Sequence, residues 1–207
     1  MAATYAHEQF ALSDDEKQAM EEMTILCRAA EDKTEQAMIL ACEQNPEVEG
    51  LRQLAWAYIE YGQVSVDADA LIISPSSVKD KSVAQVAVIL LHEWQHVKRD
   101  HHARWKVLFA GLNEPMRQVI WHTAWNYAAD CEINSALINE HVLVGLQDDS
   151  VVPGYGDYKC LPAGLTAEEY FDLIKSNPAL WAIVDRHVIQ KYGIKPSDAV
   201  ILKTEAV

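Results

Sequence analysis

The chain of 207 residues is half hydrophobic and 23% charged, a balance typical of a globular protein whose core is stable without disulfide or metal staples. Its net charge of −14 argues against nucleic acid as a partner, because affinity for a phosphate backbone rests on clustered cations. The longest aliphatic run, Val86 to Leu91, is too short to cross a bilayer, and the first residues carry no secretory signal pattern. We therefore expect one cytoplasmic domain over residues 1–207, of host or phage origin, with no membrane partner. Its core should span about 13–175, followed by a C-terminal extension over 176–207.

The cysteines carry no metal or redox signature. Cys27, Cys42, Cys131 and Cys160 form no CxxC pair, so they indicate neither a zinc knuckle nor a redox dithiol. A reducing compartment would leave all four as free thiols.

The first third of the sequence predicts two helices. Ser13 and Glu16 have the spacing of a capping box and open a long first helix. Asn45-Pro46 ends it, and a second helix is expected from there to about Tyr61, where Gly62 would end it.

The next segment predicts a short hairpin and then more helices. Val64–Val66 and Leu71–Ile73 are close enough to pair as strands. A helix from Ser82 is apolar nearly all round as far as Leu91, which indicates a central, buried position. Further helices are expected from Asn113-Glu114-Pro115 to about Glu140, from Thr166 to Ile174, and within Pro178–Val207, with a loop over 145–165. This pattern favours a mainly helical α+β fold with a small sheet beside the third helix.

The residues His92-Glu93-Trp94-Gln95-His96 carry the strongest chemical signal. Two imidazoles four residues apart lie on one helix face, about 40° and roughly 6 Å apart, so both can reach one Zn²⁺. The intervening Glu93 is then positioned to take a proton from the metal-bound water. These polar groups interrupt an apolar helix, where a metal would satisfy them. The alternative is a buried His/Glu hydrogen-bond cluster without metal.

A catalytic zinc usually has a third protein ligand, and two histidines just downstream compete for that place. His101 and His102 follow the motif, but the arrangement that would use them needs a glycine to break the helix, and residues 97–100 contain none. If the helix continues, His101 lies about 180° and His102 about 80° from the required face. Neither is well placed by this argument.

Asp130 is the preferred third ligand. It lies on a mainly apolar face of the predicted helix from Asn113, where a carboxylate needs a cation or several donors. The alternative is a salt bridge to Arg104. The same helical face carries Val119, Thr123, Asn126, Tyr127, Ile133, Asn134 and Leu137, whereas Gln118 and Glu132 are expected on the other side.

The segments HEWQHVKRDHHAR and WNYAADCEIN resemble the putative metallopeptidase domain family, which pairs HExxHxxxxHxxR with a downstream WNxAxDxxIN helix. The resemblance covers about Tyr61 to Ile174 and implies a zincin-like fold. It further implies that His92, His96 and Asp130 are metal ligands and that Glu93 is the base. Other matching positions are expected to support the ligands or pack the helices: His101, Arg104, Asn126 and Asn134. The family domain is often fused to a von Willebrand A-like module, which is not expected here, so no partner-binding role is taken from the fused form.

The sequence therefore predicts a peptidase with one Zn²⁺ that acts on a protein or peptide. Activity should fall in acid, because metal binding requires neutral imidazoles. Two alternatives remain: a non-catalytic, metal-stabilised protein-binding module, or a zinc hydrolase of a non-peptide amide. A substrate backbone is expected along an edge strand formed by Leu71, Ile72, Ile73 and Ser74. Tyr155, Tyr158 or His141 could supply the electrophilic donor opposite the base.

Overall fold

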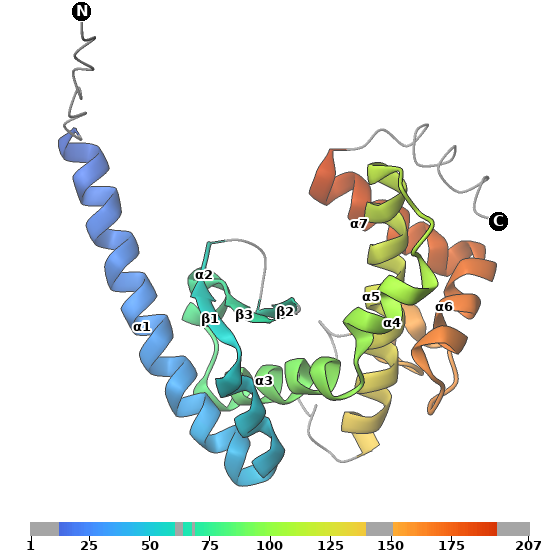
Figure 1. Cartoon of the computed structure of the whole chain (residues 1–207), viewed down its shortest axis with the longest axis horizontal. Coiled ribbons are helices and arrows are strands. Elements are labelled where there is room, and N and C mark those ends of the chain that lie inside the picture. The colour runs from blue at the N-terminus through green and yellow to red at the C-terminus, as the bar shows by residue number, and fades with distance from the viewer. Residues whose placement is uncertain (1–12, 61–63, 68, 140–150, 194–207) are drawn as a thin grey trace, which may run out of the picture.

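The computed structural model describes residues 13–60, 64–67, 69–139 and 151–193. Helix α3 (Val83–Lys98) runs between two groups of elements (Figure 1). On one side lie α1 (Asp14–Gln44) and a three-stranded sheet, and on the other lie α5 (Pro115–Asn139), α6 (Ala167–Ser176) and α7 (Pro178–Tyr192). The predicted α+β class, mainly helical with a small sheet, is confirmed. None of the described helices is long and apolar enough to span a membrane.

The hydrophobic core is divided between these two groups. One cluster joins α1, the sheet and α3 through buried residues such as Met38, Leu71 and Leu90. A second, rich in aromatic residues, joins α5, α6 and α7 around Trp125 and Tyr170. Helix α3 also contacts α5 directly, so polar side chains on its α5-facing surface lie between the two clusters.

Capping residues begin the helices where the sequence predicts. Ser13 and Glu16 form both hydrogen bonds of the capping box that opens α1. Ser82 pairs with Gln85 in the same way at the start of α3. Thr166 caps α6, and α7 follows from Pro178. Each cap satisfies backbone N–H groups that the first helical turn leaves without partners.

The predicted second helix begins at Pro46 as expected, but it is a short 3₁₀ helix, and the prediction is wrong beyond Gln53. A 3₁₀ helix, η1 (Pro46–Gln53), follows α1, and residues Ala55–Tyr58 then form strand β1. Strand β1 pairs in parallel with β3 (Ala70–Ile73), so its backbone partners come from 15 residues further along the chain. Such long-range pairing overrides local helix preference. Gly62, the predicted end of that helix, lies outside the described residues.

The predicted hairpin is confirmed, but its place in the sheet differs from the expectation. Strand β2 (Ser65–Asp67) pairs antiparallel with β3, and the strand order is β1-β3-β2. Because β1 occupies the other side of β3, the segment Leu71–Ser74 is not an edge strand, and that prediction is wrong. A short helix, α2 (Pro75–Lys79), leads from β3 toward α3.

The helix that carries the HExxH motif ends at Lys98. Asp100 adopts the left-handed conformation, with φ of 55°, and a separate helix, α4 (His101–Leu108), begins directly after it. Aspartate tolerates this conformation better than most residues other than glycine. The chain therefore turns without a glycine, so the helix does not continue to His101, and the placement of His101 about 180° from His92, which assumed that it does, is wrong.

Candidate metal centre

The candidate centre lies where α3 faces α5. An apolar contact next to the centre fixes the relative position of the two helices. Val88 of α3 contacts a small cluster formed by Ile133, Leu137 and Val152. His92 follows Val88 by one helical turn, and Asp130 precedes Ile133 by nearly one turn. The apolar contact therefore brings the histidines of α3 opposite the carboxylate of α5.

His92, His96 and Asp130 form a three-membered group of facing ligand atoms, the only such group in the part of the chain that the structure describes. The two Nε2 atoms lie 3.1 Å apart, and each lies 3.2 Å from Oδ1 of Asp130. Ligands of a tetrahedral zinc with bonds of about 2.0–2.1 Å are about 3.3 Å apart. The donor set and its spacing thus fit zinc.

These three side chains remain partly open to solvent. Their exposed fractions are 17% for His92, 18% for His96 and 26% for Asp130. A metal held by three protein atoms keeps a position for a water or a substrate oxygen only if that position is accessible. The exposure agrees with such an open site.

Charge favours a cation at this position. Burial alone would lower the pKa of His92, but the hydrogen bond and charge of Asp130 outweigh it and raise the pKa to about 9. Burial would likewise raise the pKa of Asp130, but its hydrogen bonds to both imidazoles hold it well below the usual range. Asp130 is therefore ionised, and its negative charge favours a cation beside the two histidines.

Glu93 is buried, with 7% of its surface exposed. Burial raises its pKa, and the nearby imidazoles of His96 and His92 offset part of that effect. Its Oε2 atom accepts a hydrogen bond of 2.9 Å from the backbone N–H of Val66 in β2. A carboxylate with a raised pKa beside a candidate metal site has the properties of a general base.

Asn134 lies against His92. Its Oδ1 atom is 2.8 Å from His92 Nδ1, and its Nδ2 atom donates to the carbonyl of Val151 over 2.9 Å. With the amide oriented in this way, Nδ1 of His92 carries the proton and Nε2 is left as the ligand atom.

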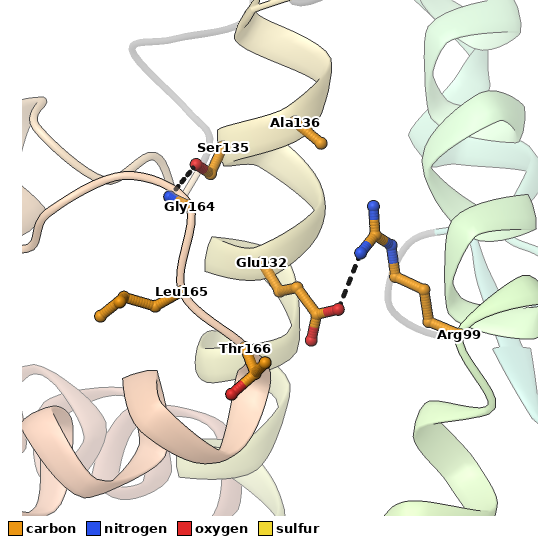
Figure 2. A pocket seen from close by; sticks show the side chains of 7 residues that line it. All are labelled: Arg99, Glu132, Ser135, Ala136, Gly164, Leu165 and Thr166. Carbon is orange, nitrogen blue, oxygen red and sulfur yellow. Dashed lines mark hydrogen bonds and ion pairs between the residues drawn. The ribbon is translucent and has the colours of Figure 1, made fainter.

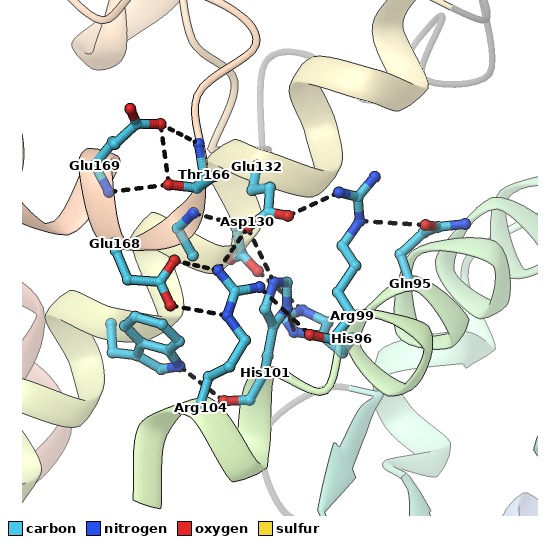
Figure 3. A network of polar contacts seen from close by, with 12 residues as sticks. Gln95, His96, Arg99, His101, Arg104, Asp130, Glu132, Thr166, Glu168 and Glu169 are labelled. Atoms are coloured by element: carbon cyan, nitrogen blue, oxygen red, sulfur yellow. Dashed lines mark hydrogen bonds and ion pairs between the residues drawn. The ribbon is translucent and has the colours of Figure 1, made fainter. Parts of the chain in front are cut away.

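His101 lies beside His96, contrary to the helical argument. The break at Asp100 turns the buried His101 side chain back, so that its Nδ1 atom is 3.0 Å from Nδ1 of His96 (Figure 3). His102 instead lies 3.6 Å from Asp67 at the end of β2. Neither histidine joins the three candidate ligands.

Arg104 does not pair with Asp130. It forms ion pairs with Glu168 and with Glu132, the latter at 3.2 Å. The alternative in which Asp130 serves only as the salt-bridge partner of Arg104 is therefore excluded.

The remaining predicted site residues are not brought to the centre. Asn126 is exposed on α5, and the structure gives it no contact with the candidate ligands. Tyr155 is exposed, Tyr158 is buried in the core of α5–α7, and His141 lies outside the described residues.

Glu132 is the residue that sequence reasoning missed. The expectation placed it away from the site, yet its side chain is only 11% exposed and contacts Arg99, His101 and Arg104. Helix α5 is buried on more than one side, so the face opposite Asp130 meets other helices rather than solvent. The sequence did carry a signal for a buried acidic partner: two arginines, Arg99 and Arg104, follow closely after the motif.

A cavity of about 290 Å³ lies beside Glu132 (Figure 2). Ser135 borders it and accepts a hydrogen bond of 2.7 Å from the backbone N–H of Gly164. None of the three candidate ligands is in the lining, which consists of Arg99, Glu132, Ser135, Ala136, Gly164, Leu165 and Thr166. The cavity is therefore separate from the candidate metal centre.

Comparison with known proteins gives one informative match. A family model described as putative metallopeptidase domain matches residues 29–179. Curated proteins and solved structures gave no significant match. The matched range contains every candidate ligand, Glu93 and the supporting residues, and it covers well over half of the chain. The chain therefore belongs to the putative metallopeptidase domain family.

Proposed function

We propose that this protein is a zinc-dependent peptidase, with His92, His96 and Asp130 as ligands. The observation that carries the proposal is the spacing of 3.1–3.2 Å among three ligand atoms next to the buried carboxylate of Glu93. A zinc ion held there supplies Lewis-acid polarisation of a carbonyl and acidification of a water molecule. Family membership supports a peptide substrate.

Glu93 is the proposed general base. It takes the proton of the attacking water and returns it to the leaving amine. A purely structural site would not need a buried carboxylate between its two histidines. The hydrogen bond from Val66 holds one carboxylate oxygen and leaves the other for the proton.

The substrate backbone is proposed to lie along β2 rather than β3. Residues of an antiparallel ladder direct their N–H groups alternately toward the partner strand and away from it. Val66 donates to Glu93, so its N–H points away from β3, and the outer edge of β2 faces the candidate centre. Because Glu93 occupies the N–H of Val66, an extended peptide added at this edge would pair with Val66 through the carbonyl of that residue and would lie next to Glu93.

The site could instead hold a structural metal. This second candidate is favoured by one observation: α3 belongs to one hydrophobic cluster and α5 to the other, so a metal between them would join two parts of the core. A zinc-bound module of this kind would be stabilised by the metal but would hydrolyse nothing.

The test compares the zinc-loaded protein with Glu93→Gln on a library of internally quenched peptides. We expect the parent to cleave members of the library, and Glu93→Gln to keep its zinc and lose at least a hundredfold in rate. Glu21→Gln, at an exposed position of α1, is the matched control and should cleave normally. Equal cleavage by Glu93→Gln and the parent would contradict the mechanism. Zinc binding without any cleavage would favour the structural module.

We also propose a cytoplasmic setting, which the four free thiols support.

A further inference from the structure

Three side chains from three helices form a line that starts at one candidate ligand. Nε2 of His96 faces His92 and Asp130, whereas its Nδ1 atom lies 3.0 Å from Nδ1 of His101. Nε2 of His101 lies 3.4 Å from Oε2 of Glu132 (Figure 3). The line therefore leads from α3 through α4 to α5, two residues beyond Asp130.

The protons along this line can be arranged in only one way when His96 binds a metal. Nε2 of His96 must offer its lone pair, so its proton is on Nδ1 and is donated to His101. Nδ1 of His101 then accepts, and its proton is on Nε2, which faces Glu132. A proton on Nδ1 of His101 would place two N–H groups against each other, so this nitrogen has to accept and the ring is neutral in this arrangement.

Glu132 is held in place from several sides. Its Oε1 atom accepts from Arg99 over 2.7 Å, and its Oε2 atom accepts from Arg104 over 3.2 Å and from the backbone N–H of Ala167 over 2.7 Å. Arg104 is itself fixed by Glu168. The groups that contact Glu132, namely Arg99, Arg104 and the N–H of Ala167, are all donors. The side chain at position 132 therefore has to be an acceptor.

We propose that Glu132 is a positioning residue for His96, acting through His101. The inference rests on the proposed metal site, but not on peptidase activity. Glu132 selects the tautomer of His101, and His101 in turn selects the tautomer and ring orientation of His96. His92 is supported differently, by the amide of Asn134. Because Ala167 begins α6, the line also connects the ligand to the docking of that helix.

The test measures zinc affinity by competition with a chromophoric chelator. Removal of the hydrogen-bond partner of a metal ligand usually weakens metal binding about 10–100-fold, and Glu132→Gln should cause a loss of this size because it removes the support that His101 gives to His96. His101→Leu should lose a similar amount. Adding Glu132→Gln to His101→Leu should cause no further loss, because Glu132 would have nothing left to act through.

Glu168→Gln is the matched control. It removes a charge from the same network and weakens the attachment of Arg104, but it leaves the line from His96 to Glu132 intact. Its zinc affinity should stay within about twofold of the parent value. Equal losses in Glu168→Gln and Glu132→Gln would show a general structural role and overturn the proposal. A further loss on adding Glu132→Gln to His101→Leu would overturn it as well.

A measurement on the unmutated, zinc-loaded protein keeps the proposal testable if a variant does not fold. Nitrogen-15 correlation spectra of the histidine rings should show the proton of His96 on Nδ1 and that of His101 on Nε2. A proton on Nδ1 of His101 would overturn the proposal. If the parent binds zinc in this arrangement but cleaves no peptide, the peptidase proposal fails and the positioning role of Glu132 stands.

Discussion

The backbone N–H of Val66 donates a hydrogen bond of 2.9 Å to Oε2 of Glu93. This contact joins β2, one edge strand of the sheet, to the proposed general base. It fixes a buried carboxylate through a backbone group, which cannot rotate away as a side chain can. Val66 therefore has two places in the proposal: it belongs to β2, along which the substrate is proposed to lie, and it positions the proposed base.

Replacing Val66 with proline should test this contact. Proline has no N–H, and it is tolerated at edge positions whose N–H points away from the sheet. We expect Val66→Pro to keep its zinc and to lose about tenfold to a hundredfold in peptide cleavage, since Glu93 would lose its fixed position. Val66→Ala keeps the N–H and serves as the control in the same peptide assay. Equal rates for the two variants would show that the hydrogen bond does not position Glu93.

The pH dependence of zinc binding should reveal the pairing of His92 with Asp130. Because the pKa of His92 is raised to about 9, the metal-free ring carries a proton below that pH, and zinc has to displace it. Affinity should therefore rise about tenfold per pH unit between pH 7 and 9. In Asp130→Asn the ring loses the charge that raises its pKa, so the affinity should be lower and nearly flat over this range.

Chelator competition at pH 7, 8 and 9 gives the slopes for that comparison. Asp69→Asn, at an exposed position beside the sheet, should retain the slope of the parent. A slope in Asp130→Asn as steep as that of the parent would contradict the assigned pairing.

Asp100 tests the helix break that brings His101 to His96. Its φ of 55° is costly for a β-branched residue, so Asp100→Val should lower the free energy of unfolding by about 1–2 kcal/mol. The same change should weaken zinc binding, because His101 would be displaced. Asp100→Gly adopts this conformation freely and should be close to the parent in both properties. Urea unfolding and chelator competition measure the two effects, and an unchanged Asp100→Val would contradict the account of the turn.

Gly50 tests the packing that supports the motif helix from the other side. A Cβ atom added at this position would overlap the ring of Trp94, which lies between the two histidines in sequence. Gly50→Ala should lower the free energy of unfolding by about 1–3 kcal/mol, as overpacking usually does. At Gly111 an added Cβ meets nothing within 4 Å, so Gly111→Ala is the control. Similar urea midpoints for the two variants would rule out this close packing.

Much of the fold follows from short-range patterns. Capping boxes at Ser13, Ser82 and Thr166 begin helices where the sequence predicts, because a cap involves residues only three positions apart. Helical periodicity likewise placed His92 and His96 on one face, and Asp130 on an apolar face of another helix. Those preferences concern a single element and need no knowledge of its neighbours.

The sequence by itself thus determined which residue types could bind a metal and on which helices they lie. Only the tertiary structure decided what surrounds them. Strand β1 forms because β3 offers it a partner, and that pairing makes β3 the central strand and leaves β1 and β2 at the edges of the sheet. His101 reaches His96 because the chain turns at Asp100, and Glu132 is buried because α4 and α6 cover its side of α5. These features depend on contacts between segments that are distant in the sequence. The local conformational preferences of the residues do not determine the geometry of such contacts.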